Sequence, residues 1–97
     1  MLRFEWDKRK AALNLKKHGV TFDEASTLLS YPLACIFDDE DHSSYEPREI
    51  IVGHSVIDRP LVVSFIEKHD GVIRIISARL ATRREKEDYE QREAEQS

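Results

Sequence analysis

Hydrophobic and polar positions change their period near Pro32. Before this residue, apolar side chains recur at helical spacing, as Phe22, Ala25 and Leu28 do. From Leu33 onward, apolar residues form short runs or alternate with polar residues, which is typical of strands. The pattern therefore predicts helices in the N-terminal part of the chain and a sheet in the part that follows.

Capping signals place two helices in the N-terminal part. Asp7 can cap a helix that runs to about His18, and Gly19 stands just past its end. Thr21, followed three residues later by Glu24, forms a capping box that opens a second, short helix. Both helices are therefore bounded by residues whose side chains or backbone suit helix ends.

Strands are expected after the helices, followed by one more helix. The expected strands are Leu33–Phe37, Arg48–Val56, Leu61–Glu67 and a run that begins at Val72. A polar loop, Asp38–Pro47, separates the first two, and the later links are short, which favours an antiparallel meander. The alternation in Leu2–Trp6 is compatible with an additional N-terminal edge strand, and Thr82 to about Glu95 is expected to be helical. The chain is therefore predicted to be α+β, with a four-stranded antiparallel sheet.

The run from Val72 combines the composition of a buried strand with two arginines. Arg74 lies within it, and Arg79 lies at its end, just before the capping box of Thr82 and Glu85. Arginine stays charged and is costly to bury alone, so each one needs a carboxylate, a route to water or an anionic ligand. A cation held beside a helix N-terminus can bind a phosphodiester.

Length and composition limit the class of protein. The 97 residues suit one domain, 1–97, and Cys35, as the only cysteine, can form no internal disulfide. No apolar run is long enough to span a membrane, and the first residues have no signal-peptide character. A cytoplasmic location without membrane contact is therefore expected.

The net charge of −4 is concentrated at the C-terminal end. Residues 1–84 hold 13 basic and 13 acidic side chains, whereas residues 85–97, the acidic end of the last helix, hold 2 basic and 6 acidic ones. Lysines and arginines also cluster between Lys8 and Lys17. A local basic patch that binds nucleic acid is thus compatible with the overall negative charge.

Several motifs follow one another in order along nearly the whole chain. They are Phe4-Glu5-Trp6-Asp7, 14–25 (Asn14 to Ala25), Glu46-Pro47-Arg48, Gly53, 74–79 (Arg74 to Arg79), Ala81, Arg84, Glu85 and Tyr89. Together they resemble BrnT, a family of toxins of bacterial type II toxin-antitoxin systems with a RelE-like fold. Many BrnT proteins are more basic than this chain.

The resemblance implies a small ribonuclease that inhibits translation by cutting RNA. It also implies a BrnA-like antitoxin that holds the toxin inactive, and contact with operator DNA only through that antitoxin. Metal-independent chemistry, with no cofactor, is expected. The alternative is a catalytically silent RelE-fold binding module that acts as corepressor with its DNA-binding partner, and a third possibility is a free-standing interaction domain.

Metal-independent RNA cleavage requires proton transfer from the 2′-hydroxyl and to the 5′-oxygen, and charge stabilisation at the phosphorane. Arg79 is the expected phosphate stabiliser, because of its position and its match to the family segment. Arg48 is a second candidate phosphate clamp. The alternatives are ordinary salt bridges, of Arg79 with Glu85 and of Arg48 with Glu46 or Asp41.

Lys17 and His18 complete the expected catalytic set, with His18 as the candidate for proton transfer. Both stand at the end of a helix, where a cation is more often simply a favourable charge. Three further residues are expected to bind substrate: His54, Arg59 and Arg74. Arg74 has opposite strand parity to Arg79, so an unbulged strand would direct the two arginines to different faces of the sheet.

Four side chains of the acidic loop are candidate metal ligands: Asp38, Asp39, Asp41 and His42. The group lacks the spaced glycine of a calcium loop and the paired histidines of a zinc site. A solvated loop is therefore expected, with no metal bound.

Overall fold

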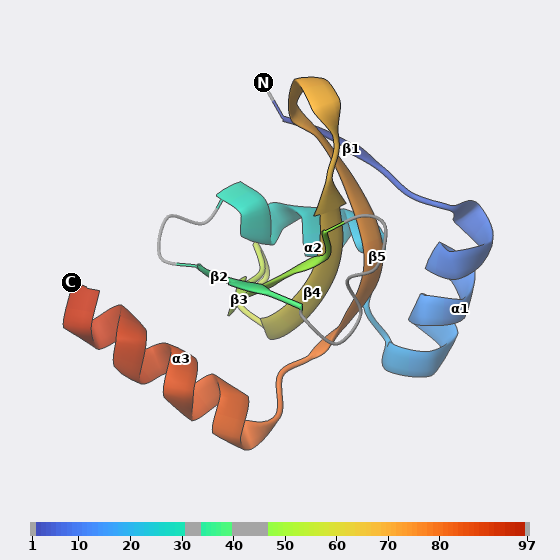
Figure 1. Cartoon of the computed structure of the whole chain (residues 1–97). Coiled ribbons are helices and arrows are strands. Elements are labelled where there is room, and N and C mark those ends of the chain that lie inside the picture. Colours follow the sequence, from blue (N-terminus) through green and yellow to red (C-terminus); the bar gives the residue numbers. More distant parts are fainter. Residues whose placement is uncertain (1, 31–33, 40–46, 97) are drawn as a thin grey trace.

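The computed structural model describes residues 2–30, 34–39 and 47–96 and contains a five-stranded sheet with helices on both faces (Figure 1). In chain order the elements are β1 (Arg3–Glu5), α1 (Lys8–His18), α2 (Phe22–Ser26), a 3-10 turn (Thr27–Ser30), β2 (Cys35–Asp38), β3 (Glu49–His54), β4 (Pro60–Glu67), a second 3-10 turn (His69–Gly71), β5 (Val72–Leu80) and α3 (Arg83–Gln96). The helices and strands expected from the sequence are therefore present. The structure describes only the ends of the predicted polar loop, since residues 40–46 lie outside it.

The sheet is mixed, which corrects the four-stranded antiparallel prediction. Its strand order is β1-β5-β4-β3-β2, and β2 to β5 form the expected antiparallel meander. The N-terminal strand β1 is also present, and it pairs with β5 in parallel. Both helices α1 and α2 separate β1 from the meander along the chain, so no tight turn constrains β1 to run antiparallel.

One face of the sheet, the core face, is covered by α2 and the 3-10 turn that follows it, and α1 lies against β5. Its buried strand residues include Ile51, Leu61, Val63, Phe65, Ile73 and Ile75. Val20, Phe22, Ala25 and Leu28 pack against them from the helical segment. The apolar positions at helical spacing therefore form one half of the core, and the alternating strand positions form the other half.

The helix ends follow the predicted capping chemistry. The Asp7 side chain accepts hydrogen bonds from the backbone N–H groups of Arg9 and Lys10. Thr21 Oγ1 accepts one from the Glu24 N–H at 3.1 Å. Gly19 ends α1 with a φ of 69°, the left-handed conformation that favours glycine.

Asn14 fastens α1 to the sheet. The pairing of β1 with β5 ends at Arg74, so within the described residues the rest of β5 has no hydrogen-bonded strand along this edge. The buried Asn14 side chain takes its place: Nδ2 donates to the Ala78 carbonyl at 2.8 Å, and Oδ1 accepts from the Ala78 N–H at 3.1 Å. Nδ2 also donates to the Val20 carbonyl. These bonds hold the last turn of α1 beside the end of β5 that carries Arg79.

Three carboxylates on adjacent strands predict a pH effect on stability. Burial raises the pKa of Glu49, and nearby Glu67 and Asp38 raise it further. A raised folded-state pKa favours folding below pH 4.5, the ordinary value, and this contribution is lost as the pH rises through the raised pKa. Glu49→Gln should therefore raise the melting temperature at pH 7. The gain in stability should be at most about 0.5 kcal/mol, because solvent screens these partly exposed charges. The gain should vanish at pH 4, and a destabilised variant at pH 7 would contradict this prediction.

No helix within the described residues is both long enough and apolar enough to cross a membrane.

Candidate functional site

The other face of the sheet, here called the outer face, carries the arginines of β5. A bulge in β5 makes this possible: Phe65 pairs with Ile75 and Ser64 with Ser77, so Ile76 has no partner in β4. The extra residue reverses the alternation along β5. The parity argument that separated Arg74 from Arg79 is therefore wrong for this strand, because the strand is bulged.

The strand pairing shows which residues share the outer face. Arg74 pairs with Ile66, Ser77 with Ser64 and Arg79 with Val62. The three partners in β4 alternate along the strand, so all six side chains lie on the same side of the sheet. Arg74 and Arg79 are thus at opposite ends of one strip of the outer face, with two serines between them.

Arg48 joins this strip from β3. The Asp39 N–H donates to the Arg48 carbonyl at 2.8 Å, which extends the β2–β3 ladder by one residue beyond Glu49. Ile50 lies on the outer face because it pairs with Ser64. Arg48 is two residues before Ile50, so the alternation of side chains places it on the same face. Three of the arginines singled out in the sequence therefore belong to one face of the sheet.

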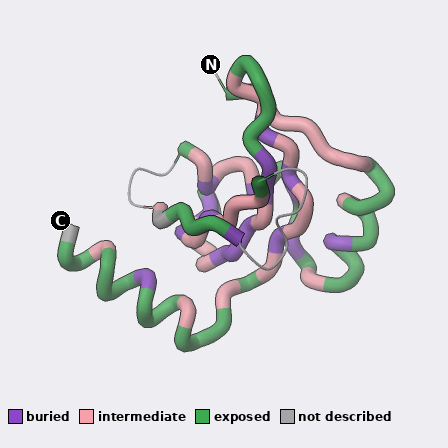
Figure 2. Tube along the Cα trace, viewed as in Figure 1, coloured by how far each residue is buried: buried purple, intermediate pink, exposed green. Residues whose placement is uncertain are grey.

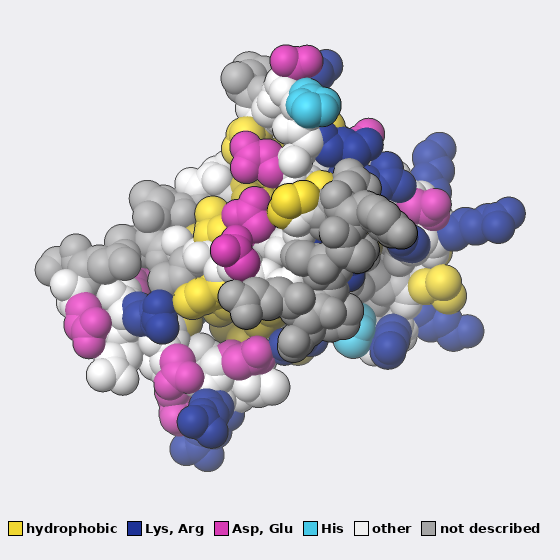
Figure 3. All heavy atoms as spheres, in the orientation of Figure 1, with side chains coloured by type: hydrophobic (Ala, Val, Ile, Leu, Met, Phe, Trp, Pro, Cys, Tyr) yellow, Lys and Arg dark blue, Asp and Glu magenta, His cyan; other side chains and the backbone are white. Residues whose placement is uncertain are grey.

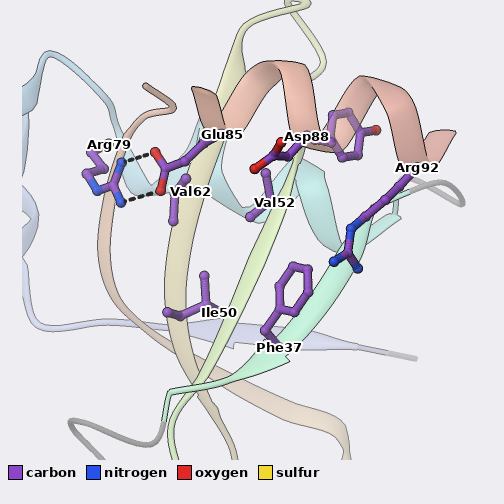
Figure 4. Close-up of a pocket in the computed structure, with 9 residues that line it drawn as sticks. Phe37, Ile50, Val52, Val62, Arg79, Glu85, Asp88 and Arg92 are labelled. Atoms are coloured by element: carbon purple, nitrogen blue, oxygen red, sulfur yellow. Dashed lines mark hydrogen bonds and ion pairs between the residues drawn. The ribbon is translucent and has the colours of Figure 1, made fainter. Parts of the chain in front are cut away.

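Arg79 is held by Glu85 in a two-pronged ion pair (Figure 4). Arg79 Nη1 donates to Glu85 Oε1 at 2.7 Å, and Nη2 donates to Oε2 at 2.9 Å. Glu85 Oε1 also accepts from the Thr82 N–H at 2.8 Å, so the capping box orients the carboxylate. The salt bridge named as the alternative for Arg79 is therefore present in the structure.

The Arg79 guanidinium, followed by the capping hydrogen bonds, lowers the pKa of Glu85 to about 2. Because the ordinary value is 4.5, the pair contributes to stability above that pH, and the contribution is lost as the pH falls toward 2. Glu85 is therefore ionised throughout the neutral range.

The ion pair leaves one edge of the Arg79 guanidinium available. Nη1 is used by Glu85 and by the Leu80 carbonyl at 3.3 Å, and Nη2 is used once, by Glu85. Within the described part of the chain, Nε has no acceptor. The side edge formed by Nε and the second Nη2 hydrogen is a fork of two donors, which matches two oxygens of a phosphate. Glu85 can thus orient Arg79 without using all of its donors.

Helix α3 covers part of the outer face and encloses a cavity of about 280 Å³. The helix is exposed along most of its length, and its buried residue is Tyr89 (Figure 2). The Tyr89 ring contacts the His54 ring edge-on, with centroids 5.3 Å apart, and Arg92 lies 5.0 Å from the centre of the Phe37 ring. The cavity is lined by Phe37, Ile50, Val52, Val62, Arg79, Glu85, Asp88, Tyr89 and Arg92. Arg79 is therefore part of a partly apolar recess between helix and sheet.

Arg59, expected to bind substrate, also has a structural role. Its Nε donates to Glu24 Oε2 at 2.9 Å, Nη2 also bonds Glu24 Oε1, and Nη2 reaches the Gly19 carbonyl at 3.2 Å. Ser55 Oγ donates to the same carboxylate at 2.6 Å. These bonds, chiefly those from Arg59, lower the pKa of Glu24. Arg59 therefore ties the β3–β4 turn to α2 and the end of α1.

Lys17 and His18 lie at the end of α1, where Lys17 is exposed and His18 is half-buried. Lysines and arginines gather over α1 in the surface view (Figure 3). Asn14, one turn earlier, bonds to Ala78, which places this helix end beside β5. Within the described residues, no hydrogen bond or ion pair joins either side chain to Arg79. Arg74 lies 3.7 Å from Glu5, whose closer ionic partner is Lys68 at 2.8 Å.

The described residues contain no group of three or more histidine, cysteine, aspartate or glutamate side chains arranged to hold a metal ion. Asp41 and His42, two of the candidate metal ligands, lie outside them.

Four residues of this region were given no site role in the sequence analysis. Glu85 appeared there only as a capping residue and possible salt-bridge partner, while Asn14, Asp88 and Arg92 carried no role. The sequence did hold one indication that Glu85 faces the sheet. Tyr89 is an aromatic residue in a polar helix, so it marks the side of α3 that faces the sheet, and Glu85, four residues earlier, lies on the same side.

The fold is shared with a known toxin. The 1.1 Å crystal structure of the Brucella abortus ribonuclease toxin, BrnT, superposes with a TM-score of 0.66 and 24% sequence identity, covering 86% of this chain and 100% of that one. At this identity the likeness establishes a common fold. Among curated protein sequences, no match was found.

The family follows from the sequence itself. The model of the family described as "Ribonuclease toxin, BrnT, of type II toxin-antitoxin system" matches residues 6–85. The chain therefore belongs to the BrnT family of ribonuclease toxins, whose members are paired with an antitoxin. The matched segment contains both Arg79 and Glu85, and it ends before most of α3.

The ion pair gives a prediction about Glu85. If the chain cleaves RNA and the carboxylate orients Arg79 on the phosphate, Glu85→Ala should lower kcat about tenfold or more, with KM little changed, because a small displacement of a group that acts in the reaction is costly. Glu85→Gln, which keeps one oxygen acceptor, should retain part of the activity. Single-turnover cleavage measures both variants, and Glu87→Gln on the exposed side of α3 is the control. An increase in activity for Glu85→Ala would show instead that the carboxylate blocks Arg79.

Proposed function

We propose that this chain cuts RNA endonucleolytically, without a metal ion, and so inhibits translation until a BrnA-like antitoxin neutralises it. The observation that carries the proposal is the state of Arg79, which is oriented by Glu85 and keeps a two-donor edge available on the face that also bears Arg74 and Arg48. Such an edge fits the non-bridging oxygens of a phosphodiester.

In this proposal the scissile phosphate binds at Arg79. The 2′-hydroxyl of the preceding ribose attacks the phosphorus, and the guanidinium stabilises the additional negative charge of the phosphorane. Arg48 and Arg74 bind neighbouring phosphates of the same strand. The P–O5′ bond then breaks, leaving a cyclic phosphate on one product and a hydroxyl on the other.

Proton transfer is assigned to the end of α1. His18 takes the proton from the 2′-hydroxyl or returns one to the 5′-oxygen, and Lys17 adds positive charge near the phosphate. The support is the attachment of α1 to β5 through Asn14, which holds the helix end beside the residue that precedes Arg79. His54 contributes to the site by packing against Tyr89, which holds α3 against the sheet.

The antitoxin is proposed to contact operator DNA and to bring the toxin there only indirectly. The toxin acts in the cytoplasm and requires no membrane or cofactor. Its single domain, 1–97, includes the acidic end of α3.

One observation favours a second candidate function. The two-pronged bond to Glu85 already satisfies the Arg79 charge, as in a purely structural ion pair. This would suit a catalytically silent binding module that serves as corepressor with its antitoxin.

Induced expression of the chain alone in bacteria distinguishes the two candidates. The toxin should arrest growth, and the neighbouring antitoxin gene should restore it. The purified protein should also cleave single-stranded RNA at an undiminished rate in excess chelator. Normal growth at full expression, together with intact RNA in the assay, would support the silent module and contradict the proposed nuclease.

A further inference from the structure

The cavity between α3 and the outer face has the composition of a small-ligand site. Its floor is formed by apolar side chains of the sheet, Ile50, Val52 and Val62, and its rim carries two arginines and two carboxylates (Figure 4). The rim charges balance, so the recess suits an uncharged ligand better than a phosphate. Its volume of about 280 Å³ lies just below the range of drug-sized sites, which begins at roughly 300 Å³.

We propose that this cavity binds one unpaired nucleobase of the RNA strand whose phosphate lies on Arg79, and that Asp88 reads the edge of that base. The inference rests on the proposed function, because it takes the strand to be bound at Arg79. It adds a specificity site that lies beside, and not at, the reacting phosphate.

The position of Arg79 connects the two sites. Its guanidinium lines the cavity and also carries the available donor edge, so we expect the base next to a phosphate on that edge to reach the cavity mouth. Proteins commonly bind unpaired RNA bases on aromatic rings and arginine planes. Phe37, which is 39% exposed, and Arg92, whose guanidinium lies over the Phe37 ring, provide an aromatic surface and an arginine plane at the far end of the cavity.

Asp88 gives the site a base preference. It is exposed on the cavity side of α3, and within the described residues no hydrogen bond or ion pair uses its carboxylate. A carboxylate offers two acceptors and no donor. Guanine presents two adjacent N–H donors on its pairing edge, whereas uracil presents one N–H between two carbonyl oxygens. The site should therefore favour guanine over uracil.

A buried apolar side chain of a partner protein is the competing occupant. It would use the floor of the cavity but leave the Asp88 carboxylate without a donor. A nucleobase uses the floor and the carboxylate together, which is why the observations favour RNA.

Binding of short RNAs tests the inference separately from catalysis. Four single-stranded RNAs that differ at one base, 2′-O-methylated to prevent cleavage, are titrated into the full chain and followed by fluorescence anisotropy. The guanine RNA should bind about tenfold or more tightly than the uracil RNA, and Asp88→Asn should remove most of this difference. Glu90→Gln, which removes an equal charge from the same helix outside the cavity, should preserve it.

Two results would overturn the inference: equal affinity of the wild-type protein for all four RNAs, or the same change in base preference for Asp88→Asn and Glu90→Gln. If the RNAs bind with the expected preference but no RNA is cleaved, the base site stands and the proposed nuclease fails. If RNA is cleaved without base preference, the nuclease stands and the base site fails.

Discussion

Arg79→Ala should lower the rate of RNA cleavage by at least about 100-fold. A single donor placed to stabilise a developing oxyanion is typically worth about 3 kcal/mol of the barrier, and Arg79 offers two donors along one edge. Removing it also leaves the Glu85 carboxylate facing the phosphate without a counter-ion. The rate constant should be measured under single-turnover conditions on a defined RNA, so that product release does not mask the effect.

Two variants make the test specific for the geometry of Arg79. Arg79→Lys keeps the charge but loses the fork, and should remain strongly impaired because an ammonium acts as a point charge. Arg83→Ala removes an exposed arginine from the first turn of α3 and should be nearly fully active. If all three variants cleave like the wild type while circular dichroism shows them folded, the assignment of Arg79 is wrong.

Asn14→Ala should lower the free energy of unfolding by about 3 kcal/mol. The side chain makes three hydrogen bonds to buried backbone groups, two with Ala78 and one with Val20. Alanine fills none of these roles, and each unsatisfied buried polar group costs about 1–3 kcal/mol, partly relieved by relaxation. For a domain of this size, the melting temperature should fall by roughly 10–20 °C.

Urea denaturation of the wild type, Asn14→Ala and Gln91→Ala measures this directly. Gln91 is an exposed amide on α3, so its replacement controls for loss of an amide group alone. A loss below about 0.5 kcal/mol for Asn14→Ala would mean that the bonds to Ala78 do not hold α1 to the sheet.

The elements of the fold were predictable because their signals are local. Capping by Asp7 and Thr21 depends on residues only a few positions apart, and alternation within a strand needs no knowledge of its neighbours. The parallel pairing of β1 with β5 was not predictable in this way, because it joins residues separated by the whole helical part and the meander.

The candidate site depended on two facts that are not local. The bulge at Ile76 determines which face of the sheet Arg74 occupies, and the run of apolar residues in β5 does not indicate that a bulge is present. Arg59 is a second example: the sequence indicated only a substrate-binding role, and its ion pair with Glu24 in α2 joins residues that are far apart in the chain. The contact of Arg79 with Glu85 was foreseeable because it spans only a helix start, yet the sequence did not show that the pair leaves one edge of the guanidinium available.

Arg79 is expected to bind the scissile phosphate through this edge of the guanidinium while Glu85 stays in place. A crystal structure of the full chain with an RNA carrying a 2′-O-methyl group at the cleavage position tests it most directly. Two phosphate oxygens should lie within hydrogen-bond distance of Arg79 Nε and Nη2, with the Glu85 carboxylate still bonded to Nη1 and Nη2. RNA bound along α1 or elsewhere, with the outer face of the sheet unoccupied, would contradict the account.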